Sequence, residues 1–381
     1  MRHALLLALV VGCGPKFVEL DTARVRKIDV GVVDASTAFC PQAGPPELRA
    51  RVTYRDNNFV QTRSRIDPRG TLRPSELRWT SDVGTIDDSA RMQLPPLLTW
   101  HDRPLSITVS VPGRPEVADR IVLTPTYDCD GRSRHDGPAG WAGGDGTHAG
   151  YAEVSLAYVD TQLNGRLVLV RVVGEGSAPE YYLLDRRGPS AARFVVSARG
   201  GDGGGGVDGS DGSRGFDGLA GSDGSAGGTC EDGGDGGDAG DGGDGGDGGD
   251  AGDGGNGADG GTVVITYPAE FPELADVVEV DVRGGYAGAG GRGGSGGSGG
   301  SGGRAGSGGS AGSTIDVDGK HCSTSSGDAG RAGRDGRSGS SGSDGSDGRA
   351  GSSGTIVRRA STIEALFGGE AADGWAIASA R

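Results

Sequence analysis

The chain has 381 residues, of which 80 are glycine and only 5% are aromatic, and its formal net charge is −15 at pH 7. A charge this negative argues against nucleic acid as a partner, because nucleic-acid phosphates repel an acidic surface. Most of the glycine lies in residues 200–354, so the unusual composition belongs to one region of the chain.

Residues 1–12 predict a signal peptide. Arg2 and His3 supply its basic end, and residues 4–11 form an unbroken apolar run that is too short to span a bilayer. The protein is therefore expected to be exported.

The apolar run ends in the letters LVVGC, which resemble a bacterial lipobox. The resemblance implies that Cys13 becomes lipidated and N-terminal, so that residues 13–24 form a tether to the membrane. Because Gly14 follows the cysteine in place of aspartate, the resemblance favours the outer membrane of a Gram-negative bacterium. The alternative is an ordinary secretory signal with a structural cysteine nearby.

Lipidation also explains the odd number of cysteines, because five cysteines in an exported protein leave one unpaired. Without Cys13, four cysteines remain, and they permit three disulfide pairings: Cys40, Cys129, Cys230 and Cys322. We favour Cys40 with Cys129, because they bracket one compositional region. We favour Cys230 with Cys322, because both interrupt glycine runs.

Residues 25–130 have the composition of a β domain. Apolar or alternating runs separated by turn-forming residues predict strands at 25–33, 48–54, 77–80, 105–109 and 121–124. About a hundred residues with short strands favour a small sandwich. The letters LRWTSDVGTID, LSITVSV and IVLTPTYDCD resemble a bacterial immunoglobulin-like domain, which implies that Trp79 is its core tryptophan.

Residues 131–199 combine a short glycine-rich passage with a β-strand insert. Alternating runs at 151–159 and 166–173 flank Asn164 and Gly165, which predicts a hairpin. Two further strands are expected at 180–184 and 193–198.

Residues 200–354 repeat glycine at every third position for most of their length. A period of three is neither that of a helix nor that of a strand, but it is the period of a polyproline II helix. Such a helix has no internal hydrogen bonds, and glycine along one edge lets a neighbouring backbone come close. The pattern therefore predicts packed polyproline II rods.

The letters GGDGGDAGDGGDGGDGG and GGRGGSGGSGGSGGRAG resemble the snow-flea antifreeze protein and the glycine-rich domains of mycobacterial PGRS proteins. This resemblance implies a polyproline II bundle and carries no function by itself. Two alternatives stay open. A collagen-like trimer would normally contain about 15–20% proline, which the periodic runs lack. The second alternative is a disordered spacer, because Gly/Ser/Asp-rich sequence buries too little apolar surface to offset the conformational entropy of the chain.

Four arms of similar length predict an antiparallel bundle: the first arm (200–228), the second (231–261), the third (284–312) and the fourth (327–354), with a strand insert at 262–283. If the arms alternate in direction, the strand segments gather at one end and Cys230 and Cys322 at the other. The second and third arms are mainly Gly-Gly-X, which gives two glycine edges, so they are expected to lie inside the bundle with two neighbouring arms each. The first and fourth arms are mainly Gly-X-Y, so they are expected to lie outside with one neighbouring arm each. The letters FVVSARGG and VEVDVRGG, which precede the first and third arms, indicate an internal repeat.

Nine aspartates of the second arm share one phase of the repeat, and we call them the acidic ladder: Asp232, Asp235, Asp238, Asp241, Asp244, Asp247, Asp250, Asp253 and Asp259. Carboxylates invite a calcium site, but the ladder lacks the spacing of known calcium repeats. Carboxylates about 9 Å apart on one rod cannot share an ion unless another rod contributes ligands. We interpret the ladder as a solvated acidic edge and expect no metal or cofactor, with calcium or ice binding as the alternative.

The five histidines show no metal-binding spacing: His3, His101, His135, His148 and His321. The sequence also contains no serine nucleophile elbow and no Cys/His pair with a third catalytic member. We therefore expect a protein that is not an enzyme and has no catalytic residues.

The last segment, residues 355–381, is expected to form a strand and a short helix. The run from Ser361 to Glu364 has the pattern of a capping box before a helix through Phe367.

Together these features predict an all-β protein with almost no α-helix: an immunoglobulin-like sandwich, β inserts and an antiparallel bundle of polyproline II helices. The expected function is that of a lipid-anchored cell-envelope protein with a structural or adhesive role, whose rod projects from the membrane. Its expected partners are the membrane, through the lipid on Cys13, and an envelope or surface protein or polysaccharide.

Overall fold

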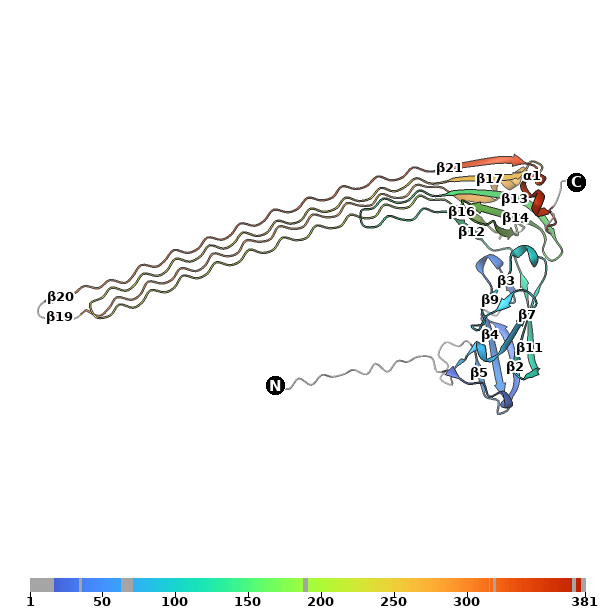
Figure 1. The fold of residues 1–381 in the computed structure, drawn as a ribbon, viewed down its shortest axis with the longest axis horizontal. Coiled ribbons are helices and arrows are strands. Elements are labelled where there is room, and N and C mark those ends of the chain that lie inside the picture. The colour runs from blue at the N-terminus through green and yellow to red at the C-terminus, as the bar shows by residue number, and fades with distance from the viewer. Residues whose placement is uncertain are drawn as a thin grey trace.

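The computed structural model describes residues 17–33, 36–62, 71–187, 191–314, 316–317, 320–371 and 375–377. These residues form mainly β-sheets with one α-helix, α1 (Ile363–Ala371), which confirms a β protein with almost no α-helix. The chain forms an N-terminal pair of sheets, a second pair of sheets, and a long rod that continues from the second pair (Figure 1). None of the helices in the described ranges is both long enough and apolar enough to cross a membrane.

The N-terminal domain contains two sheets, with strand orders β1-β6-β5-β4-β2 and β3-β11-β10-β7. Their strands are β1 (Phe17–Val18), β2 (Val25–Val32), β3 (Ala38–Phe39), β4 (Leu48–Tyr54), β5 (Phe59–Gln61), β6 (Thr71–Leu72), β7 (Arg78–Ser81), β10 (Leu105–Val111) and β11 (Arg114–Pro125). A separate hairpin pairs β8 (Thr85–Ile86) with β9 (Met92–Gln93). Because β1 pairs with β6, the first sheet already begins within the segment expected to be a tether.

Short 3-10 helices connect several of these strands and one pair in the second half of the chain. They are η1 (Thr22–Arg24), η2 (Pro41–Ala43), η3 (Pro74–Glu76), η4 (Leu97–Thr99) and η5 (Pro272–Asp276). Three of them, η2, η3 and η5, carry proline at the start, where its missing N–H costs no hydrogen bond.

The two N-terminal sheets enclose a buried apolar core. In β10 every second side chain is buried, and the intervening serines and threonine are half-buried, as expected of a strand with one face on a core. Trp79 is half-buried against this core, and its Nε1 donates a hydrogen bond to the Pro74 carbonyl at 3.0 Å. Trp100 is only 3% exposed, so it is the more deeply buried tryptophan of the two.

The second pair of sheets forms the base of the rod, with strand orders β12-β16-β18 and β15-β14-β13-β17-β21. The strands are β12 (Gly131–Arg134), β13 (Tyr151–Thr161), β14 (Gly165–Gly174), β15 (Glu180–Leu184), β16 (Phe194–Ser197), β17 (Thr262–Pro268), β18 (Val278–Asp281) and β21 (Thr355–Ser361). Side chains from both sheets, including Val154, Val196 and Val263, belong to one buried cluster. The two sheets therefore pack face to face.

The hairpin expected around Asn164 and Gly165 is confirmed. Strands β13 and β14 pair antiparallel from Ala152 opposite Gly174 to Thr161 opposite Gly165. Gly165 has a φ of +67°, a backbone conformation that glycine adopts without strain.

The internal repeat also has a structural counterpart. Strands β16 and β18 pair in parallel, with Phe194 opposite Val278 and Ser197 opposite Asp281, so the two similar segments lie side by side. Strand β12 adds a third parallel strand, with Gly131 opposite Phe194. The sequence did not predict β12 because its letters, GRSR, contain no apolar side chain.

The C-terminal helix covers the other face of the five-stranded sheet. Phe367 of α1 and Trp375 pack with Tyr127 and Leu167 in one buried cluster. This cluster also joins the base to the N-terminal domain, because Leu97 of η4 packs against it.

The cap of α1 differs from the expected capping box. Thr362 precedes the helix, and its Oγ1 accepts a hydrogen bond from the Ala365 backbone N–H at 3.2 Å. Ser361 is instead the last residue of β21, where the ladder with β17 holds it. The expected cap was one residue early, and the helix continues past Phe367 to Ala371.

Candidate functional site

The four arms continue the strands of the base as two layers. The first and third arms lead away from the base after β16 and β18, and the second and fourth return to β17 and β21 (Figure 1). Arms of one layer are parallel and bonded through their backbones. Gly203 N donates to Tyr286 O at 2.8 Å, and equivalent bonds recur at every third residue up to Gly227 N and Ser310 O.

Arms of different layers run antiparallel and are bonded in the same way. Gly234 of the second arm donates its N–H to Ser225 O of the first at 2.9 Å, and its carbonyl accepts the Gly309 N–H of the third at 2.8 Å. Each middle arm therefore has three neighbouring arms and each outer arm has two. Among the four long arms, these numbers of neighbours exceed the expected two for a middle arm and one for an outer arm, because the arms form two layers instead of a single row.

Residues 137–150 form a short pair of arms beside the first and second arms. Gly137 N donates to Arg199 O at 2.8 Å, and Gly204 N donates to Gly144 O at 2.9 Å. From the sequence this passage is expected to be a separate short glycine-rich run. It is instead a part of the rod that covers only the portion next to the base.

Glycine recurs because neighbouring backbones leave no room for a side chain. A Cβ on Gly206 would lie 2.0 Å from Gly252 O, and one on Gly297 would lie 2.0 Å from Ser213 O. Real Cβ atoms do not approach oxygen this closely, so each such position requires glycine.

The first arm also shows where this requirement ends. Gly201 is glycine under the short pair of arms, where a Cβ would lie 1.8 Å from Pro138 O. Beyond the short arms the same phase of the repeat holds side chains, among them Val207, Phe216 and Leu219, which are 61%, 89% and 82% exposed. These side chains occupy the edge on which a further arm would otherwise pack.

The acidic ladder accepts hydrogen bonds from the fourth arm. Asp244 Oδ1 accepts the Arg337 N–H at 2.7 Å. All nine carboxylates accept a backbone N–H at 2.6–2.8 Å, eight of them from the fourth arm and Asp232 from Ser325 just before it. Asn256, which stands in the same phase, accepts the Arg349 N–H at 2.9 Å. The Ser325 N–H lowers the pKa of Asp232 below its usual value, because it favours the ionised carboxyl. The ladder is thus exposed, as expected, and it also joins two arms.

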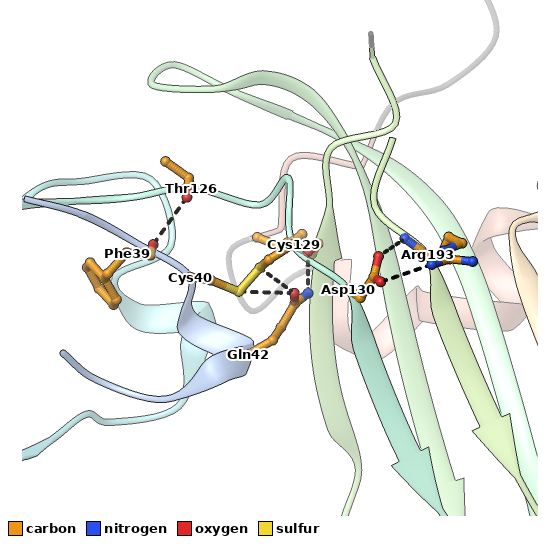
Figure 2. The surroundings of a disulfide bond; sticks show 8 residues. Phe39, Cys40, Gln42, Thr126, Cys129, Asp130 and Arg193 are labelled. Atoms are coloured by element: carbon orange, nitrogen blue, oxygen red, sulfur yellow. Dashed lines mark hydrogen bonds and ion pairs between the residues drawn. A yellow bond between two sulfur atoms is a disulfide. The ribbon is translucent and has the colours of Figure 1, made fainter. Parts of the chain in front are cut away.

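The two disulfides lie at opposite ends of the rod. Cys230 is bonded to Cys322 at the far tip, with Cα atoms 5.7 Å apart. Cys40 is bonded to Cys129 where the N-terminal domain meets the base, as Figure 2 shows. These are the two pairs favoured from the sequence. Cys13 lies outside the described residues.

Several contacts besides the disulfide hold the N-terminal domain on the base. The Gln42 side-chain amide, which lies against the disulfide in Figure 2, donates to the Leu183 carbonyl of β15. Asp102 accepts the backbone N–H groups of Gln162 and Leu163 at 2.7 and 2.8 Å. Together they fix how the domain sits on the base.

Three of the histidines, His101, His135 and His148, have structural contacts. The His101 ring packs against the Trp375 ring, with centroids 4.5 Å apart and planes tilted by 35°, and His148 Nδ1 accepts the Asp259 N–H at 3.2 Å. His135 Nε2 lies 3.0 Å from the Ser133 hydroxyl. Across the described part of the chain, no group of three or more His, Cys, Asp or Glu side chains could hold a metal ion.

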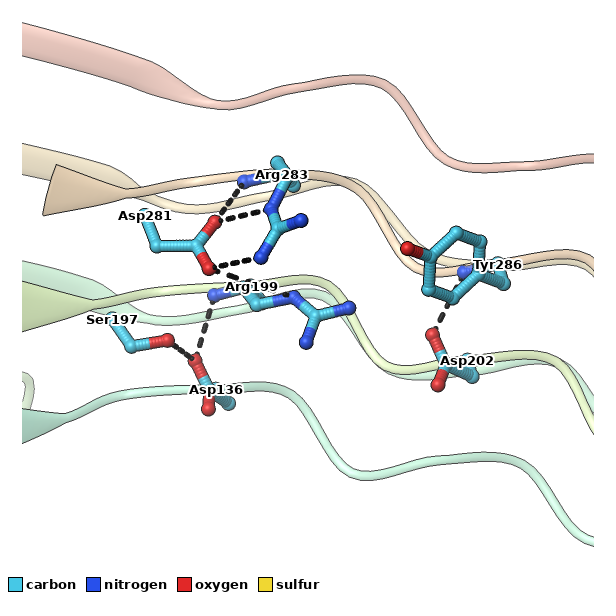
Figure 3. Close-up of polar contacts among 7 residues, drawn as sticks. All are labelled: Asp136, Ser197, Arg199, Asp202, Asp281, Arg283 and Tyr286. Atoms are coloured by element: carbon cyan, nitrogen blue, oxygen red, sulfur yellow. Dashed lines mark hydrogen bonds and ion pairs between the residues drawn. The ribbon is translucent and has the colours of Figure 1, made fainter.

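The outer face of the β12-β16-β18 sheet carries a cluster of arginines. Because β12 alternates buried and exposed residues, Arg132 and Arg134 both lie on this exposed face. Arg283 donates to both Asp281 carboxylate oxygens at 2.8 and 2.7 Å, and Arg199 Nε lies 3.9 Å from the same carboxylate (Figure 3). This cluster is not predicted from the sequence, although an arginine directly before the glycine run stands in both repeated segments.

Comparison of the chain with protein families, curated proteins and solved structures finds no match. Function is therefore inferred from the rod, its base and the surfaces that they present.

Proposed function

We propose that this protein is a lipid-anchored component of the cell envelope, in which a stiff glycine-rich rod carries an interaction surface as a structural or adhesive element. The observation that carries the proposal is the continuous set of backbone hydrogen bonds between arms, from the base to the tip. A spacer needs no such bonds, whereas a rod that must keep its direction does.

Within this proposal the arms are polyproline II helices. The three-residue recurrence of the bonds supports this, since one edge of such a helix faces each neighbour at every third residue. The N-terminal domain is an immunoglobulin-like sandwich, supported by its two sheets around a common core.

The anchor rests on the sequence around Cys13. Metabolic labelling with a palmitate analogue tests it: the wild-type chain should be labelled and recovered with membranes, and Cys13→Ala should be neither. Equal labelling of both chains would rule out the anchor while leaving the rod untouched.

Stiffness of the rod is tested by amide hydrogen exchange. The glycine N–H groups that bond between arms should exchange slowly, because each must break a bond within a packed bundle. Fast exchange throughout residues 200–354, with small-angle scattering of a flexible coil, would instead identify a solvated spacer.

Calcium binding has less support than a structural role, because one oxygen of every ladder carboxylate already accepts a backbone N–H. Ice binding rests on the resemblance of sequence alone. Calcium titration and ice-shaping assays test the two alternatives.

A further inference from the structure

The outer face of the β12-β16-β18 sheet is hollowed by two adjoining cavities. One, of about 300 Å³, is lined in part by Arg132, Arg134, Arg199 and Arg283. The other, of about 510 Å³, lies toward the N-terminal domain and shares Arg132 and Val195 with the first. Together they form a groove along the sheet, which we call the arginine groove.

The acidic side chains of the smaller cavity are already paired. Asp281 is held by both donors of the Arg283 fork, which lowers the pKa of that carboxyl. Asp136 accepts the Ser197 hydroxyl and, at 2.8 Å, the Arg199 backbone N–H (Figure 3). Neither carboxylate therefore needs a further cation.

Two arginines of the groove, in contrast, have unused and accessible donors. Among the described residues, Arg132 and Arg134 make no side-chain hydrogen bond or ion pair, and both side chains are exposed. Arg199 Nε also has no hydrogen-bond partner, but it is buried and therefore out of reach of a ligand. A guanidinium presents a planar fork of donors that fits a carboxylate or phosphate, so the groove offers sites for an oxyanion.

The walls of the groove indicate which kind of anion fits. Asp130, Glu279 and Gln42 line the larger cavity, where Asp130 lies 3.6 Å from Arg193 Nη2. A densely charged polyphosphate would meet these carboxylates, whereas a chain of sugars with spaced carboxylates and hydroxyls between them would not. Two adjoining polar cavities also suit a chain better than a single small ion.

The net charge of −15 does not prevent such binding. At physiological ionic strength charges are screened beyond about 8 Å, so most of the acidic ladder, which extends along the rod toward the tip, contributes little at the base. Within the two cavities the arginines outnumber the carboxylates by one: Arg132, Arg134, Arg193, Arg199 and Arg283 against Asp130, Asp136, Asp281 and Glu279.

We propose that the arginine groove binds an acidic oligosaccharide whose carboxylates are held by Arg132 and Arg134. This inference deepens the proposed interaction role and rests on it, since it names the partner chemistry and the site. It does not depend on the anchor, because binding can be measured with the purified chain in solution.

Isothermal titration calorimetry with tetragalacturonate, with the neutral maltotetraose as a comparison, tests the proposal on the full chain. We expect the acidic tetramer to bind and the neutral one not to bind. The double variant Arg132→Ser/Arg134→Ser should weaken binding at least about tenfold, because it removes the charge-assisted hydrogen bonds to the ligand carboxylates. Both side chains are exposed, so the melting temperature should stay unchanged.

The matched control is Arg334→Ser/Arg337→Ser on the fourth arm, which removes the same charge far from the groove. Its affinity should stay within about twofold of wild type, because the screened charges lie beyond the groove. Equal weakening by both double variants, equal binding of the neutral tetramer, or tighter binding of polyphosphate than of tetragalacturonate would overturn the proposal. Loss of palmitate labelling in Cys13→Ala cells bears only on the anchor.

Discussion

Contact with the backbone of a neighbouring arm decides which positions of the rod must be glycine. Positions 205 and 206 of the first arm show this side by side. A Cβ on Gly206 would lie 2.0 Å from Gly252 O, whereas the nearest atom to a Cβ on Gly205 is 3.8 Å away. The same residue type is therefore obligatory at one position and replaceable at the next.

We predict that Gly206→Ala lowers the free energy of unfolding by about 1–3 kcal/mol, because the first and second arms must separate to admit the methyl group. Gly205→Ala should be neutral or should stabilise by up to about 1 kcal/mol, since alanine restricts the unfolded chain. Thermal and denaturant unfolding of the two variants provide the measurement. Similar losses in both would show that composition, and not contact, dictates glycine here.

The Asp281 carboxylate at the base makes the stability of the protein depend on pH. Arg283 donates to both oxygens of Asp281 and holds the pKa of that carboxyl below its usual value. A lowered folded-state pKa means that the ion pair stabilises the protein above the ordinary aspartate value of about 3.9. That stability is lost as the pH falls through the lowered pKa.

For this reason Asp281→Asn should lower the melting temperature at pH 7, and the difference from wild type should shrink as the pH falls below about 4. Melting curves of both chains from pH 7 to pH 2 check this expectation. A difference that stays constant over that range would assign the effect of the variant to packing.

At the scale of an element, the acidic ladder is a set of acceptors that aligns two parallel arms. Its carboxylates lie in one phase of the second arm, and each meets the same kind of N–H on the fourth arm. Asn256 does the same without a charge, so the oxygen atom and its position matter more than the ionisation.

This interpretation predicts different results for two substitutions of one ladder residue. Asp244→Asn keeps the acceptor and should leave the exchange rate of the Arg337 amide nearly unchanged. Asp244→Ala removes the acceptor and should speed exchange of that amide by several-fold to about tenfold, as expected for one hydrogen bond of about 0.5–1.5 kcal/mol. Hydrogen exchange followed by NMR or mass spectrometry reads both, and faster exchange in the asparagine variant would point to charge as the main contribution.

At the scale of the whole molecule, apolar burial is concentrated at one end. The base and the N-terminal domain contain the buried clusters, whereas the arms are held mainly by backbone hydrogen bonds. The tip is farthest from these clusters, and there the Cys230–Cys322 disulfide joins segments 92 residues apart. In the chain-entropy account, closing a loop of this size stabilises by about 4 kcal/mol.

Cys230→Ser/Cys322→Ser should therefore loosen the rod from the tip. Amides near residues 228–236 and 306–312 should exchange faster, while those next to the base keep their rates, because the sheets still hold them. Hydrogen exchange of the two chains provides the test. Uniform acceleration along the arms would mean that the rod opens as one unit.

The sequence by itself determined the β character, the hairpin, the arm boundaries and the contrast between Gly-Gly-X and Gly-X-Y arms. These features follow from local periodicity, which the order of residues states directly. It also favoured the two disulfide pairs, because Cys40 and Cys129 bracket one compositional region and Cys230 and Cys322 both interrupt glycine runs. The sequence predicted helix α1 but placed its N-cap at Ser361, because both Ser361 and Thr362 are residue types that favour this position. In the structure Ser361 is paired with β17 as the last residue of β21, so Thr362 caps the helix.

Only the tertiary structure decided which segments of the chain are neighbours. That the arms form two layers, that residues 137–150 belong to the rod, and that the acidic ladder accepts N–H groups of the fourth arm depend on contacts between segments about 60 to 110 residues apart. A repeat of period three leaves the identity of the neighbouring arm open, because every arm offers the same groups in the same phase. The strands of the base determine which arms become neighbours. Their apolar side chains pack in one register, and the arms continue the order of the strands in the two sheets.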